Sequence, residues 1–153
     1  MSVLAVVRPD SWNLPLLLHI AGAMVLVGGV LTAVSALALA NGDGRLLRLG
    51  HRALLLVGLP GYVVMRGAAE WIADKEGYND KGAPEPDWLG IGYIVADAGI
   101  LLLLVALVLG GLGLRRMRNG KGGEGQVKAM LILSVVLLVA YTVAVWAMSA
   151  KPG

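Results

Sequence analysis

Residues 14–40 read LPLLLHIAGAMVLVGGVLTAVSALALA, an apolar run in which His19 is the one ionisable side chain. A helix rises about 1.5 Å per residue, so a bilayer core of about 30 Å needs about 20 residues to cross it. Because hydrocarbon offers no partner to open backbone groups, a run of this length must be helical there. The run is also longer than the apolar core of a signal peptide, about 7–15 residues. It therefore predicts a retained membrane-spanning helix.

Three more apolar runs follow, at about residues 46–73, 88–114 and 127–150. Each is long enough to cross a bilayer, and none alternates in the way that β-barrel strands do. We therefore predict an all-α fold, an integral membrane four-helix up-down bundle that forms a single domain over residues 1–153. The expected helices cover about residues 13–40, 45–74, 88–114 and 126–150.

The composition excludes several other classes of protein. Of the 153 residues, 58% are hydrophobic and 15% are charged, against about 25% charged in an ordinary soluble domain. The chain has no Cys, which excludes disulfides, thiolate metal sites and cysteine nucleophiles. The net charge of +3 is distributed as in a membrane protein, so we expect the lipid bilayer as partner and no nucleic acid.

The charges of the three connections predict an orientation. The first and third connections are basic, with Arg45, Arg48 and Arg52 in one and Arg115, Arg116, Arg118, Lys121 and Lys128 in the other. The middle connection is mainly acidic, with Asp74, Glu76, Asp80, Glu85 and Asp87. Basic connections stay on the cytoplasmic side, so both termini are expected outside. The four Trp residues agree, because each falls at the outer end of its predicted helix: Trp12, Trp71, Trp88 and Trp146.

Each predicted helix carries one polar side chain seven to nine residues from its outer end: His19, Arg66, Asp97 and Tyr141. The helical rise places all four about 10–13 Å below the outer surface. Glu70 lies one turn outward of Arg66 on the same face. Charged groups at this depth cost several kcal/mol unless they are paired, and they usually face the bundle interior. We therefore predict a buried polar layer of these four residues, with Glu70 above it.

Two interpretations of this layer stay open. Arg66 and Asp97 could form a purely structural ion pair that fixes the second helix to the third, or a functional site could use the same pair. His19 is expected to face the interior, because its side of the helix continues through small residues. It could there be an axial haem ligand, a copper ligand, a proton carrier or a packing residue. That side of the helix carries Gly22, Leu26, Gly29, Ala33 and Ala36.

Two other features of the second helix bear on the site. His51 is only seven residues from the first turn, and its height differs from that of His19 by about 24 Å. One iron therefore cannot bind both histidines, and His51 is expected near the cytoplasmic headgroups. Pro60 is expected to kink the helix, since it removes a backbone donor.

The first helix, from His19 through the Gly28-Gly29 pair, resembles the opening helix of the copper-resistance D superfamily of small bacterial membrane proteins. The second helix is similar to that family's in its Arg-rich start and its Pro60-Gly61 pair. Membrane-type protoporphyrinogen oxidase, which uses a first-helix His for haem, is similar in outline. The resemblance implies a multi-pass protein of the bacterial inner membrane, with His19 as a possible ligand of haem or copper. Two expected features are missing. The third run has no Lys to match the Lys ligand of the oxidase, and the chain lacks the abundance of Met and His expected of a copper importer.

Three function classes follow from the sequence. The first is binding of haem or a metal ion, with His19 as the metal ligand and with cofactor contacts from the other polar residues, namely Arg66, Asp97, Tyr141 and Glu70. The second is a proton or small-ion carrier that uses Asp97, Glu70 and His19. The third is a non-catalytic accessory subunit of a larger membrane complex. Small-residue faces also favour a homo-oligomer, and no residue is assigned a catalytic role.

Overall fold

The computed structural model describes residues 10–82 and 86–150, and within them the chain forms helices joined by turns. The predicted all-α fold is therefore confirmed for this part of the chain. In chain order the elements are η1 (Asp10–Trp12), α1 (Asn13–Leu39), α2 (Gly44–Ala53), η2 (Leu54–Gly58), α3 (Leu59–Glu76), α4 (Asp87–Arg118) and α5 (Glu124–Ala150).

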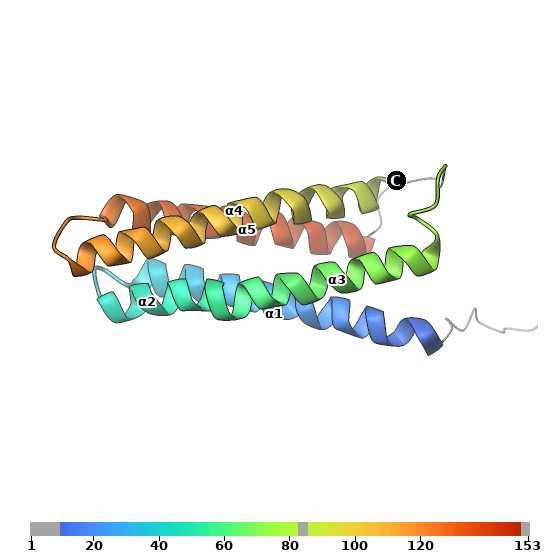
Figure 1. Cartoon of the computed structure of the whole chain (residues 1–153), viewed down its shortest axis with the longest axis horizontal. Coiled ribbons are helices and arrows are strands. Elements are labelled where there is room, and N and C mark those ends of the chain that lie inside the picture. The colour runs from blue at the N-terminus through green and yellow to red at the C-terminus, as the bar shows by residue number, and fades with distance from the viewer. Residues whose placement is uncertain (1–9, 83–85, 151–153) are drawn as a thin grey trace, which may run out of the picture.

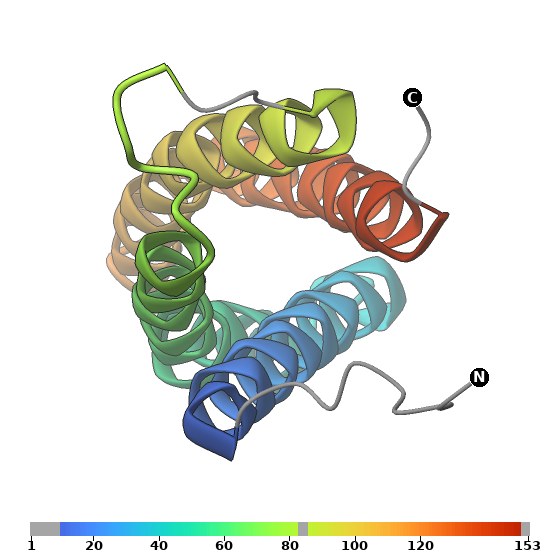
Figure 2. The same ribbon diagram turned by 90° about the vertical axis from the view of Figure 1, so that its right-hand side faces the viewer.

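The helices form two antiparallel hairpins (Figure 1). One pairs α1 with the continuous helix made of α2, η2 and α3, and the other pairs α4 with α5. We call the end of the bundle with the α1–α2 and α4–α5 turns the hairpin end. The opposite end, called the terminal end, holds the start of α1, the end of α3, the start of α4 and the end of α5. Viewed from the terminal end, the order around the bundle is α1, α3, α4, α5 (Figure 2).

Four helices are long and apolar enough to cross a membrane, at Asn13–Leu39, Gly44–Glu76, Asp87–Arg118 and Glu124–Ala150. Their outer surfaces carry large exposed apolar side chains, among them Met24, Leu39 and Ile94, each 70% exposed or more. Such a surface is unfavourable in water and favourable in lipid. The architecture is that of a multi-pass membrane bundle.

The helix bounds differ from the sequence prediction mainly at the end of α4. The apolar run ends at Leu114, but the helix continues to Arg118. Arg is a good helix former, and cations near a helix C-terminus interact favourably with its dipole. Asn119 caps the helix, and Gly120 after it has a φ of +67°. The apolar run therefore marked the apolar part of the helix and not its full length.

The first hairpin is held by direct backbone contact. A Cβ on Gly22 would lie 2.5 Å from the Met65 backbone nitrogen, and a Cβ on Gly61 would lie 2.6 Å from the Leu26 nitrogen. Only glycine allows two helices to approach so closely. The face of α1 expected to be buried is buried as predicted: Gly22, Leu26, Gly29, Ala33 and Ala36.

The two hairpins meet unevenly. α1 contacts α5, and α2 contacts α4, whereas α3 and α4 share few contacts. The fully buried core residues Val30, Leu103, Met130 and Leu137 come from both hairpins. The junction of α3 and α4 is thus the part of the bundle with the least apolar packing.

A π-helical segment directly precedes Pro60, where the sequence predicted a kink. Residues Leu54–Gly58 form this segment, and the Leu59 N–H bonds the Leu54 carbonyl, five residues back. Pro60 follows at the first turn of α3. Because proline has no N–H and crowds the carbonyl four residues before it, the preceding turn widens.

Candidate functional site

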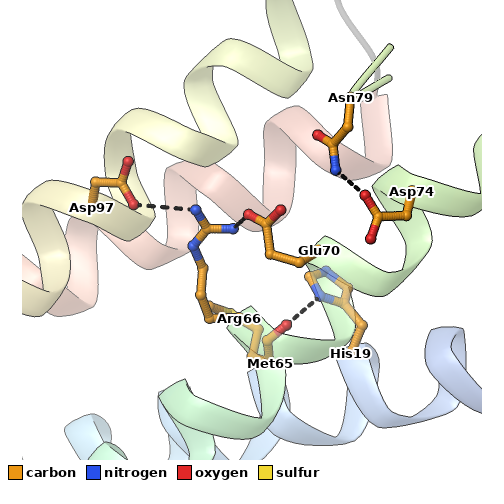
Figure 3. Close-up of polar contacts among 7 residues, drawn as sticks. All are labelled: His19, Met65, Arg66, Glu70, Asp74, Asn79 and Asp97. Carbon is orange, nitrogen blue, oxygen red and sulfur yellow. Dashed lines mark hydrogen bonds and ion pairs between the residues drawn. The ribbon is translucent and has the colours of Figure 1, made fainter. Parts of the chain in front are cut away.

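The polar side chains of the terminal half gather around Arg66 (Figure 3). Its guanidinium forms an ion pair with Glu70, one turn further along α3. Its Nη2 lies 3.5 Å from Oδ1 of Asp97 on α4. Figure 3 shows Arg66 between the two carboxylates. One guanidinium is therefore shared between two acids from different hairpins.

An aromatic contact adds to this cluster. The Arg66 guanidinium carbon lies 4.9 Å from the centre of the Tyr93 ring, a cation–π distance. Tyr93 and Asp97 are four residues apart on α4, so both lie on the side of that helix that faces Arg66. Arg66 thus bridges α3 to α4 at the junction where apolar packing is sparse.

His19 lies beside the cluster rather than in it. Its Nδ1 is 3.0 Å from the backbone carbonyl oxygen of Met65, the residue before Arg66. A carbonyl can only accept, so Nδ1 carries the hydrogen. In the neutral ring this leaves the Nε2 lone pair free. The side chain is half-buried at the α1–α3 contact.

Tyr141 lies on the other side of α4. Its ring packs against Gly99, where an added Cβ would be 2.8 Å from the phenol oxygen. The residue is 4% exposed, and within the described residues its hydroxyl has no hydrogen-bond partner. Buried hydroxyls are rarely left unpaired. Tyr141 is therefore a polar group with unused hydrogen-bonding capacity. It forms no hydrogen bond with Arg66 among the described residues.

These contacts agree with the common level predicted for the polar residues. His19 forms a hydrogen bond with Met65, the residue before Arg66. Arg66 pairs with Asp97, and Tyr141 packs against Gly99, two residues from Asp97. The predicted burial is wrong for Asp97, whose side chain is 67% exposed, and only partial for Arg66, at 25%. Height follows from residue count, but burial depends on how each helix is rotated. The buried face of α4 runs through Ala96 and Gly99 and turns Asp97 away from α5.

Sequence reasoning placed Tyr62 one turn from Arg66 on the same face but missed a second aromatic member of this region, Tyr93. Tyr93 lies one turn from Asp97, a spacing that would have placed it on the same face. Tyr62 lies one turn before Arg66, is 7% exposed and is close enough to interact electrostatically with Arg66 and Asp97. Tyr62 also lies within electrostatic range of Tyr141. The cluster therefore continues inward from Arg66 through phenols.

His51 makes a contact that the sequence did not predict. It is half-buried, and its Nε2 lies 3.0 Å from the Leu107 carbonyl oxygen of α4. Its ring packs against Gly110, because glycine has no side chain that would occupy the space of the ring. It is therefore a contact between the two hairpins. The two histidines bond different helices, and nothing brings them to one shared site.

In the part of the chain that the structure describes, no group of three or more His, Asp or Glu side chains could hold a metal ion. Comparisons with protein-family models, with curated proteins and with solved structures found no match for this chain. The site must be interpreted from its own geometry.

Proposed function

We propose that the protein is a membrane carrier of protons or small cations, with the acids paired to Arg66 as its binding groups. The observation that supports this most directly is the sharing of one guanidinium by Glu70 and Asp97. Two carboxylates with one shared counter-charge carry an excess negative charge. At membrane depth, that excess favours uptake of a proton or a cation.

Asp97 is the acid best suited to exchange. Its oxygen is 3.5 Å from Arg66, a longer ion-pair distance than that of Glu70, and its side chain is the more exposed of the two. A loosely paired carboxylate can gain or lose a proton with little rearrangement. Glu70 instead keeps Arg66 in place, and Tyr93 supports the guanidinium from α4.

The orientation proposed for this carrier follows the charges of its connections. The hairpin end carries Arg45, Arg48, Arg115 and Arg116, so we place it in the cytoplasm. The polar cluster then lies in the outer half of the bilayer. The resemblance of the first two spans to the copper-resistance D superfamily favours a bacterial inner membrane.

The experiment is proton flux into vesicles that contain the purified full chain and a trapped pH-sensitive dye. Valinomycin and potassium hold the membrane potential while the outside pH is stepped down. We expect faster acidification than in empty vesicles and a loss of that flux in Asp97→Asn. A sodium or potassium gradient at constant pH tests a metal cation by the same assay.

The matched control is Asp80→Asn, the same chemical change in the α3–α4 loop. It should leave the flux unchanged. A purely structural ion pair predicts a different result, in which wild type shows no flux and Asp97→Asn only lowers the free energy of unfolding. That outcome would overturn the proposal.

Haem binding is a second candidate, supported by the Nδ1 hydrogen bond of His19. A backbone carbonyl that holds Nδ1 fixes the ring and would leave Nε2 to bind the haem iron. Arg66 fits a haem propionate poorly, because Glu70 and Asp97 already neutralise it. His19 would hold the iron, and the haem would supply electron transfer.

An absorption spectrum separates the two candidates. Purified protein titrated with haemin should give a Soret band if His19 is a ligand, and His19→Ala should remove it. His51→Ala is the matched control, since that ring bonds α4 at Leu107. An unchanged band in His19→Ala would rule out the haem site while leaving the flux experiment unaffected.

A further inference from the structure

The hairpin end of α4 carries a surface pocket of about 390 Å³, remote from the polar cluster. Three of its six lining residues are cations, and the acid that begins α5, Glu124, is not among the six. The pocket is therefore positively charged. It is lined by Leu112, Arg115, Arg116, Asn119, Lys121 and Gln126.

The backbone that carries these cations is held in place. The Asn119 N–H donates to the Arg115 carbonyl at 3.2 Å, and the Lys121 N–H donates to the Arg116 carbonyl at 2.9 Å. These bonds satisfy carbonyls that the end of a helix leaves open. A Cβ on Gly113 would lie 2.9 Å from the Gly123 oxygen, so the loop also packs directly on α4.

One guanidinium is also oriented by a side chain. With its amide oxygen turned toward Arg116, Gln126 of α5 accepts a hydrogen bond from Nη1 at 2.7 Å. The amide nitrogen then donates to the Gly123 carbonyl at 3.3 Å. Arg116 is therefore fixed on one side and presents its remaining donors to the pocket.

The pocket also has an apolar wall. Leu112 lies one turn before Arg116, is 50% exposed and belongs to the apolar surface of α4. The pocket thus lies at the boundary between the apolar band of the bundle and its basic end. Acyl chains and headgroups of a bilayer meet at such a boundary.

We propose that this pocket binds a phosphate group, supplied either by an anionic lipid headgroup or by a soluble phosphate. Arginine presents paired donors that match phosphate oxygens, and lysine adds a point charge. Arg115, Arg116 and Lys121 provide both kinds of donor on a fixed backbone. The polar cluster plays no part in this site, so the two proposals stand independently.

The experiment is calorimetric titration of the full chain in a maltoside detergent. The probes are dihexanoyl phosphatidic acid, dihexanoyl phosphatidylcholine and inorganic phosphate. We expect phosphatidic acid to bind more tightly than phosphatidylcholine, whose choline offsets the charge. Arg116→Gln should weaken phosphatidic acid binding about tenfold, the value of one charge-assisted hydrogen bond.

Three variants make the result specific. Arg116→Lys keeps the charge but loses the paired donors of the guanidinium. Gln126→Ala keeps all cations but removes the hydrogen bond that holds Arg116. Each variant should weaken binding about threefold. Arg48→Gln is the matched control, since it removes the same charge at the same end without lining the pocket. It should change binding less than twofold.

The probes also separate the two sources of phosphate. Binding of phosphatidic acid without inorganic phosphate assigns a lipid headgroup, and equal binding of both assigns a soluble anion. The proposal is overturned if Arg48→Gln weakens binding as much as Arg116→Gln, because the attraction is then a diffuse property of the basic end. Equal affinity for phosphatidic acid and phosphatidylcholine overturns it as well.

Discussion

The α1–α3 and α4–α5 interfaces both contain glycines, but the glycines do different things. In the first, Gly22 and Gly61 face the backbone of the opposite helix. In the second, Gly99 and Gly110 face the side chains of Tyr141 and Met130. Backbone cannot move aside without bending a helix, whereas the end of a side chain can rotate. The same residue type therefore sets a rigid contact in one hairpin and an adjustable one in the other.

The largest effect is expected for Gly22→Ala in the rigid contact. The new methyl group would lie 2.5 Å from the Met65 nitrogen, so α1 and α3 must separate. We expect a loss of about 3 kcal/mol in the free energy of unfolding, the upper part of the usual overpacking range. Circular dichroism during denaturation in mixed micelles measures it. A loss below about 1 kcal/mol would show that this hairpin is as adjustable as the other.

A smaller effect is expected for Gly110→Ala in the adjustable contact. The methyl group meets the thioether of Met130 and the ring of His51. Methionine has three rotatable bonds and adapts to changes of shape. We expect a loss of about 1 kcal/mol, the lower part of the overpacking range, in the same assay. If this variant loses as much as Gly22→Ala, the distinction between the two interfaces is wrong.

His19→Leu tests the hydrogen bond that crosses the rigid contact. The bond from Nδ1 to the Met65 carbonyl joins α1 to α3. Hydrogen bonds between membrane helices average about 0.6 kcal/mol, and we expect a loss of that size. Denaturation of this variant beside wild type measures it. A loss as large as that of Gly22→Ala would show that polar bonding, rather than close packing, holds this hairpin.

The smallest effect is expected for Gly28→Ala on the exposed side of α1. No atom lies within 4 Å of the added Cβ. The free energy of unfolding should change by less than about 0.5 kcal/mol, as for most surface substitutions. This variant is the control for the other two glycine-to-alanine changes, because it adds the same methyl group without a new contact. A large loss here would mean that this surface is covered in the folded protein.

The fold could be predicted from the sequence because it depends on quantities that add up along the chain. Four apolar runs of sufficient length define four helices, and a fixed rise per residue sets the level of Arg66 and Asp97. The stripe from Gly22 to Ala36 was also sufficient to identify the buried face of α1. None of these inferences needs to know how one helix is rotated against another.

The candidate site was harder to predict because it depends on that rotation. Asp97 was expected inside the bundle, yet the small residues Gly92, Ala96 and Gly99 already mark a buried face of α4 that excludes it. The partner of His19 is a backbone carbonyl, which no side-chain pattern reveals. His51 was placed by its closeness to a turn, although the glycines opposite it give its ring room against α4.

The π-helical segment Leu54–Gly58 controls this rotation in the second membrane helix. A π-turn holds one residue more than an α-turn, so everything beyond it is turned by about 100° from the register of an unbroken α-helix. Arg66 and Glu70 lie beyond it and owe their direction toward α4 to that extra residue. The direction in which Arg66 and Glu70 point is thus set about two turns before Arg66. The five residues of the π-helical segment that set it carry no polar side chain.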